Sequence, residues 1–124
     1  MDLKSNRNRR SRLFICFKWA FEGLMYALQT ERNVRIHFTA AIVVLGAAFA
    51  FNFSYYERLL LFGVIGFVIG MELVNTAIER LVDLVSPGEH PLAKRAKDVG
   101  AAAVLTAVCV AVAVAMTIFF HHFM

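Results

Sequence analysis

Three long apolar runs divide this chain, and polar segments separate one run from the next. The runs cover residues 36–53, 58–82 and 99–120. At about 1.5 Å per residue, runs of roughly 18 to 25 residues match a hydrocarbon core about 30 Å thick. The pattern therefore predicts an all-α integral membrane protein with three transmembrane helices, in a single domain of residues 1–124.

The segment before the first run follows a helical period. Its apolar residues recur near every 3.6 positions, and its polar residues fall on the opposite face. This pattern predicts an amphipathic helix over residues 13–30 on the membrane surface, after a polar, basic tail over residues 1–12. A helix packed against protein on the soluble side is the alternative. The apolar set is Leu13, Phe14, Phe17, Ala20, Phe21, Leu24, Met25 and Leu28, and the polar set is Ser11, Lys18, Glu22 and Gln29.

Composition agrees with this fold, and the distribution of charge predicts its orientation. Hydrophobic residues make up 60% of the chain, more than the roughly half that is usual in soluble domains. Eight of the 13 basic residues precede position 36, and three more lie in the loop 83–97. Basic residues mark the cytoplasmic side, so the N-terminus and this loop are predicted to be cytoplasmic. Beside membrane spans, a basic start is more typical of contact with anionic lipid than of a nucleic-acid partner.

The remaining composition gives no sign of a disulfide framework. Cys16 and Cys109 lie in apolar stretches, and the four histidines form no ligand pattern. Small residues recur on the second and third runs, which lets membrane helices approach closely. Because three helices shield few polar groups from lipid, we expect an oligomer.

Four polar residues of the second run share one helix face. Glu72, Asn75, Glu79 and Asp83 are spaced by 3, 4 and 4 residues, which keeps them within about 80° on a helix. A carboxylate at membrane depth costs about 2.5–3.5 kcal/mol on insertion scales, so Glu72, the most embedded, is a functional candidate. It could accept a proton from a lipid hydroxyl. Oxygen ligands near headgroup depth also suit magnesium. Asp83 receives no role beyond support of the helix end.

Other interpretations of this face stay open at this point. The polar residues could join helices through hydrogen bonds, with the outer charges marking the membrane boundary. A small proton-coupled multidrug exporter also needs an embedded Glu, although such exporters usually have four spans. A holin-like or assembly role leaves the charged face unexplained. The chain carries neither a Walker loop nor a protein-kinase signature, so residue spacing alone does not establish phosphoryl transfer.

A longer string narrows these possibilities. The segment from Glu72 to Asp83 (ELVNTAIERLVD), followed by Ala96-Lys97-Asp98, resembles the signature of the prokaryotic diacylglycerol kinase family. The strings ERNVRIH from Glu31, HPLAK from His90 and FKWAFEG from Phe17 resemble its undecaprenol kinase branch, typical of Gram-positive bacteria.

The resemblance implies a multi-pass lipid kinase of the bacterial cell membrane, dependent on ATP and magnesium. Its reaction would phosphorylate undecaprenol and give undecaprenyl phosphate for cell-wall precursor recycling. Diacylglycerol, which would yield phosphatidic acid, is the alternative acceptor. The family also works as a homotrimer whose active sites are shared between protomers.

The resemblance further implies roles for residues on the membrane side. Glu72 would be the general base that activates the lipid hydroxyl, and Asn75 would support Glu72 or the lipid headgroup. Glu31 and Glu79 would hold the magnesium that bridges the ATP phosphates. Arg12 would contact the lipid.

Nucleotide-binding roles follow from the same resemblance. Lys97 and Asp98 match the family's nucleotide-binding pair, and Glu89 and His90 match its loop contact. Trp19 falls where the family places an aromatic residue near the adenine.

Overall fold

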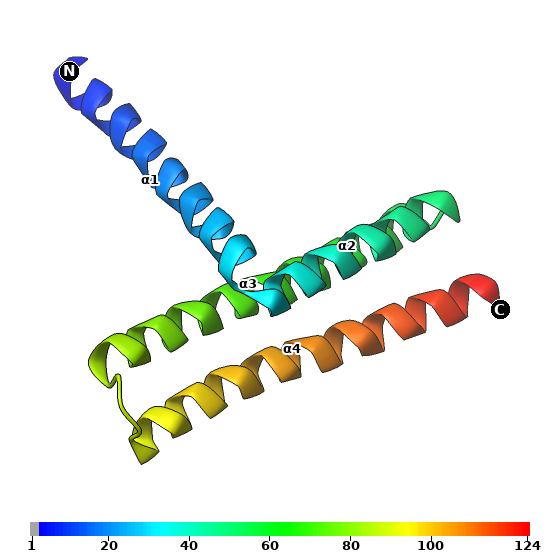
Figure 1. The fold of residues 1–124 in the computed structure, drawn as a ribbon. Coiled ribbons are helices and arrows are strands. Elements are labelled where there is room, and N and C mark those ends of the chain that lie inside the picture. Colours follow the sequence, from blue (N-terminus) through cyan, green and yellow to red (C-terminus); the bar gives the residue numbers. More distant parts are fainter. Residues whose placement is uncertain (1–2) are drawn as a thin grey trace.

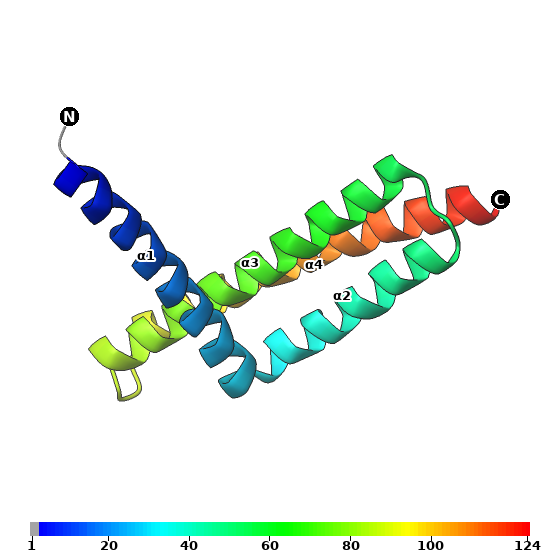
Figure 2. The same cartoon turned by 90° about the horizontal axis from the view of Figure 1, so that it is seen from above.

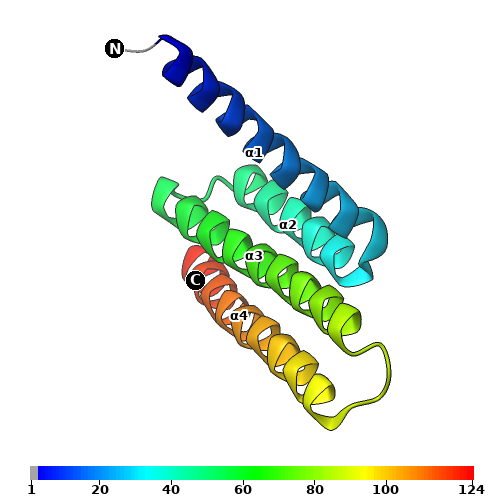
Figure 3. The same ribbon diagram turned by 90° about the vertical axis from the view of Figure 1, so that its left-hand side faces the viewer.

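The computed structural model describes residues 3–124, with side chains from Asn8 onward, and this part of the chain forms four helices. They are α1 (Leu3–Thr30), α2 (Arg32–Ala50), α3 (Tyr55–Val85) and α4 (Pro91–Phe123). The helices α2, α3 and α4 run alongside one another, whereas α1 leaves this bundle obliquely (Figures 1 and 2). Within the bundle, α3 lies between α2 and α4 (Figure 3).

Three helices are long and apolar enough to cross a membrane, namely α2, α3 and α4. This confirms the prediction of three helices that could span a membrane by their length and composition. The 19 residues of α2 rise roughly 28 Å, close to the thickness of a hydrocarbon core. With 31 and 33 residues, α3 and α4 extend beyond α2 at the end where they are joined by their loop (Figure 1).

The turn between α2 and α3 is set by local backbone chemistry. The first run was predicted to continue to Phe53, but α2 ends at Ala50. Asn52 has a φ of 54°, a left-handed conformation that asparagine tolerates better than most residues and that a helix does not. The next helix begins with a capping box, in which Ser54 Oγ accepts the Glu57 N–H at 3.2 Å and the Ser54 N–H donates to the Glu57 carboxylate at 2.8 Å.

The loop between α3 and α4 is shorter than predicted. Polar composition suggested a loop over residues 83–97, but α3 continues to Val85 and α4 begins at Pro91. Proline is favoured at the first helical position, and His90 Nδ1 accepts the Leu92 N–H at 3.1 Å as a helix cap. The four charged residues of the 94–98 segment, Lys94, Arg95, Lys97 and Asp98, therefore lie on the first turns of α4.

Helix α1 begins at Leu3, well before residue 13, so residues 3–12 of the predicted polar, basic tail are helical. Lysine and arginine are good helix formers, and no glycine or proline precedes Gly23. Residues 1 and 2 of that predicted tail lie outside the described range. Within residues 8–30 only Ala27 is buried, and large apolar side chains such as Phe17, 75% exposed, project freely.

A small apolar core lies near the α2–α3 turn. It contains Ala48, Phe53, Leu61 and Ile118, and the Phe53 ring packs edge-on against Phe119 with 4.9 Å between centroids. Most other large apolar side chains of the bundle are exposed. A bilayer can cover such a surface, whereas in water it would be an aggregation liability.

Candidate active site

The polar face predicted on α3 lies inside the helix bundle. Glu72 and Asn75 are only 4% and 8% exposed, and Thr76, one turn after Glu72, is buried as well. Spacings of three and four residues place side chains on one side of a helix. Because α3 is the middle helix, this side contacts its neighbours instead of lipid.

Glu72 meets a histidine from the first transmembrane helix. His37 Nε2 on α2 lies 3.0 Å from Glu72 Oε1, and the two side chains are 23% and 5% exposed. The Thr76 hydroxyl donates to the backbone carbonyl of Glu72 at 2.9 Å and leaves the carboxylate free. His37 also lines an apolar pocket of about 320 Å³ between α2, α3 and α4. The imidazole that contacts the Glu72 carboxylate therefore borders an apolar region, and electrostatic contacts are stronger in such surroundings than in water.

Asn75 links the same face to Glu79 and to α4. Its Nδ2 donates to Glu79 Oε1 at 3.0 Å. Its Oδ1 is buried and has no hydrogen-bond partner among the described residues. This oxygen points at Gly100 on α4, where an added Cβ would lie 2.4 Å away. Only glycine fits at position 100 without displacing the amide.

Gly100→Ala is expected to destabilise the protein, because the new methyl group occupies the space of the Asn75 amide. Overpacking of this kind typically costs about 1–3 kcal/mol. The matched control is Gly46→Ala on α2, where an added Cβ meets nothing within 4 Å and alanine improves helix propensity. Thermal unfolding in detergent should place Gly100→Ala clearly below Gly46→Ala. Equal midpoints would show that Asn75 can move away without loss.

A second layer of charge lies where α1 turns into α2. The Glu31 carboxylate accepts a charge-assisted hydrogen bond from the Arg80 guanidinium on α3. The same guanidinium lies 5.8 Å from the centre of the Tyr26 ring on α1. Arg80 follows Glu72 by eight residues, or roughly 12 Å along a helix. The α1–α2 junction therefore contacts α3 about two turns beyond Glu72, toward the α3–α4 loop. Arg80, which makes this contact, directly follows Glu79 in the chain.

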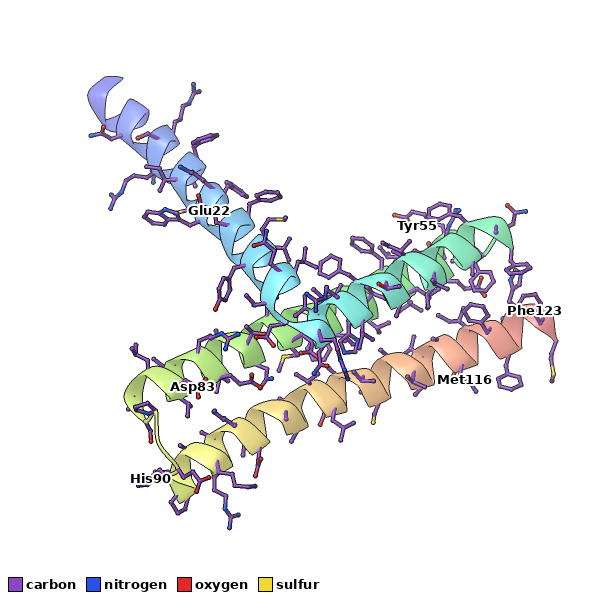
Figure 4. All side chains as sticks on the ribbon, viewed as in Figure 1. Glu22, Tyr55, Asp83, His90, Met116 and Phe123 are labelled. Carbon is purple, nitrogen blue, oxygen red and sulfur yellow. The ribbon has the colours of Figure 1, made fainter. Side chains whose placement is uncertain are left out.

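A third layer lies at the α3–α4 loop, where Asp83 and His90 share one end of the bundle (Figure 4). The predicted pair Lys97 and Asp98 forms separate contacts, since Lys97 binds Asp83 at 2.5 Å and Lys94 binds Asp98 at 2.6 Å. Asp83 thus joins α3 to α4. A pocket of about 910 Å³ is bordered here by charged and loop residues. These include Asp83, Glu89, His90, Lys94 and Lys97.

Two predicted site residues lie apart from these layers. Arg12 and Trp19 belong to α1, the helix that leaves the bundle obliquely (Figure 1), and both are exposed, Trp19 by 64%. A single chain does not bring them to Glu72 or to the loop pocket.

Comparison with known proteins identifies the family. The family model described as prokaryotic diacylglycerol kinase matches residues 18–119. The chain belongs to the prokaryotic diacylglycerol kinase family. It is 40% identical to an undecaprenol kinase of Bacillus subtilis over 119 residues, 96% of this chain and 97% of that protein.

Two diacylglycerol kinases of the same family are less similar to this chain. The diacylglycerol kinase of Pseudomonas aeruginosa is 37% identical over 92 residues, 74% of this chain and 75% of that protein. The enzyme of Escherichia coli K12 is 31% identical over 121 residues, 98% and 99% of the two chains. Membership confirms the resemblance carried by the string from Glu72 to Asp83, and it favours a kinase over an exporter or a purely structural protein.

The carboxylates of Glu79 and Glu31 are of the kind that a magnesium ion uses as ligands. In the described residues no three His, Cys, Asp or Glu side chains lie close enough to hold a metal ion by themselves. Magnesium commonly binds one or two carboxylates and fills its shell with water and phosphate oxygens. Glu79, held by Asn75, and Glu31, held by Arg80, are oxygen donors of this kind. The donor set therefore fits a magnesium ion that arrives with a nucleotide.

Two residues of the site, His37 and Arg80, were not predicted from the sequence. His37 was set aside with the other histidines, although an ionisable residue inside a membrane span is a functional candidate by the same rule that singled out Glu72. Arg80 occurs in the sequence analysis only as one letter of the string from Glu72 to Asp83. No sequence signal indicated its pairing with Glu31.

Proposed function

We propose that this kinase transfers the terminal phosphoryl group of ATP to the hydroxyl of undecaprenol. The observation that carries the proposal is the Glu72 carboxylate, 4% exposed on a membrane helix and 3.0 Å from His37. A base at this depth can meet a hydroxyl carried by a lipid. The match to a protein named undecaprenol kinase, at 40% identity over 96% of this chain and 97% of that protein, supports undecaprenol as the acceptor. The product, undecaprenyl phosphate, would serve cell-wall precursor recycling.

Glu72 acts as the general base in this proposal. Its carboxylate takes the proton of the lipid hydroxyl while the lipid oxygen forms a bond to the terminal phosphorus. The bond from that phosphorus to the bridging oxygen breaks in line, and ADP leaves with the electron pair. Asn75 keeps the neighbouring carboxylate of Glu79 in place through its amide. Buried, fixed groups of this kind lower the cost of reaching the reactive geometry.

The nucleotide binds toward the α3–α4 loop. Lys97 and Asp98 lie on the first turns of α4, and Glu89 and His90 border the loop pocket. The Lys97 ammonium can offset negative charge on the phosphates. Glu79 and Glu31 would hold the magnesium, which neutralises phosphate charge when it is bound.

We further propose a homotrimer in which α1 of one protomer completes the site of another. Arg12 and Trp19 lie away from the polar face of their own chain, as does the exposed apolar surface of α1. In this arrangement α1 rests on the cytoplasmic face of a bacterial cell membrane, with the 83–97 segment on the same side. Trp19 would approach the adenine of a neighbouring site, and Arg12 the lipid.

A side-by-side assay tests the acceptor. Purified protein in bilayers is given radiolabelled ATP, magnesium and either undecaprenol or diacylglycerol, and labelled lipid is counted over time. A higher kcat/KM is expected for undecaprenol. A preference for diacylglycerol would instead establish the second candidate, which the relatives from Pseudomonas aeruginosa and Escherichia coli favour. Labelling of neither lipid would overturn the proposed function.

A further inference from the structure

We propose that His37 is a positioning residue of this reaction, and that its imidazole fixes the carboxylate of Glu72 for proton transfer. The inference rests on the proposed function, because it assigns a partner to the proposed base. Its basis is the 3.0 Å contact between His37 Nε2 on α2 and Glu72 Oε1 on α3. That separation lies within the usual hydrogen-bond range.

His37 is the contact that remains once the other neighbours are assigned. The Thr76 hydroxyl donates to the Glu72 backbone, and the Asn75 amide donates to Glu79. In the part of the chain that the structure describes, no other side chain forms a hydrogen bond or ion pair with the Glu72 carboxylate. A buried carboxylate without a donor is costly, so this contact matters for keeping the group in place.

The contact also has a direct chemical use. An imidazole N–H that holds one carboxylate oxygen leaves the other oxygen to accept the lipid proton. Proton transfer needs the base within about 2.6–3.2 Å of the hydroxyl. A carboxylate on a flexible glutamate side chain would otherwise sample several orientations. His37 thus restricts Glu72 to one of them, and it does so from a different helix.

The apolar surroundings of His37 strengthen this effect. The ring borders the pocket between α2, α3 and α4, whose other lining residues are aliphatic. In such a region water competes little for the carboxylate, so one protein donor has a large influence on its orientation.

Three substitutions at His37 test the proposal. His37→Phe and His37→Ala remove the N–H donor, and either is informative if the other fails to fold. His37→Gln keeps an N–H donor of similar reach. The matched control is His121→Phe, at the opposite end of the bundle, where the histidine side chain is 86% exposed. Each variant is assayed with undecaprenol and labelled ATP in bilayers, and rates are normalised to folded protein from size-exclusion chromatography.

Loss of the donor is expected to lower kcat by up to about 100-fold, because a misplacement near 1 Å has effects of that size. The KM for ATP should stay unchanged, His37→Gln should recover much of the lost rate, and His121→Phe should match the wild type. A merely structural bridge between α2 and α3 would lower the amount of folded protein and leave kcat per folded protein unchanged.

The inference is overturned if donor-free variants keep the wild-type kcat, or if His37→Gln is as slow as His37→Phe. These outcomes leave the proposed function intact, since the wild-type protein still phosphorylates the lipid. If the wild-type protein does not phosphorylate the lipid, the proposed function is wrong, and the proposed role of His37 is wrong with it.

Discussion

Glu72→Gln is expected to lower kcat by about 10²- to 10⁴-fold, the usual contribution of a general base. Glutamine has nearly the same size and keeps an oxygen that His37 can reach, so the fold should survive. The amide cannot take the proton of the lipid hydroxyl. Labelled-lipid formation measures the loss, and thermal unfolding in detergent verifies that the variant remains folded.

The matched control for this substitution is Glu22→Gln on α1. Glu22 is on α1 (Figure 4). It is exposed and lies 4.0 Å from Lys18, and exposed ion pairs of this kind contribute little to stability. Its replacement should leave turnover near the wild-type value. Full activity in Glu72→Gln would contradict the role of Glu72 as base, whereas loss of folded protein in that variant alone would indicate a structural role.

Glu79→Gln is expected to raise the magnesium concentration needed for half-maximal activity by at least about 10-fold. Even residues outside the first ligand shell change metal affinity by 10- to 100-fold when they are replaced. The glutamine oxygen can still accept the hydrogen bond of Asn75, so the local fold should be kept. Excess magnesium should restore part of the rate.

A magnesium titration separates this effect from that of Glu72. Activity of Glu72→Gln should not return at any magnesium concentration, since the missing group is a proton acceptor. An unchanged half-maximal magnesium concentration in Glu79→Gln would remove this residue from the proposed ligand set.

The helices and their polar face could be predicted because both depend on local pattern. Long apolar runs define spans regardless of how they pack, and the 3- and 4-residue spacing of Glu72, Asn75 and Glu79 fixes a common face on any helix. Both features follow from residues that are near one another in sequence.

The partners of that face could not be predicted, since they come from other helices. The contact of His37 with Glu72 depends on how α2 is rotated against α3. The close approach of Asn75 to Gly100 depends likewise on the height of α4, which periodicity along one helix does not fix. Small residues on the third run indicated close packing there, but not which residue they would meet.

Most charged residues of segment 83–97 were wrongly predicted to lie in a loop, for a related reason. Polar composition suggested a long loop, whereas the His90 cap and Pro91 begin α4 early. That early start places Lys97 on a helix that faces Asp83, a contact that gives Asp83 a role in joining α3 to α4.

The most direct test of the account is a single-turnover assay with undecaprenol in bilayers, at saturating magnesium and radiolabelled ATP. The wild-type protein and Glu72→Gln are compared, and nucleotide binding is measured on the same samples. We expect equal nucleotide affinity in the two proteins, rapid label transfer by the wild type, and transfer about 10²- to 10⁴-fold slower by the variant. Transfer by Glu72→Gln at the wild-type rate would contradict the account.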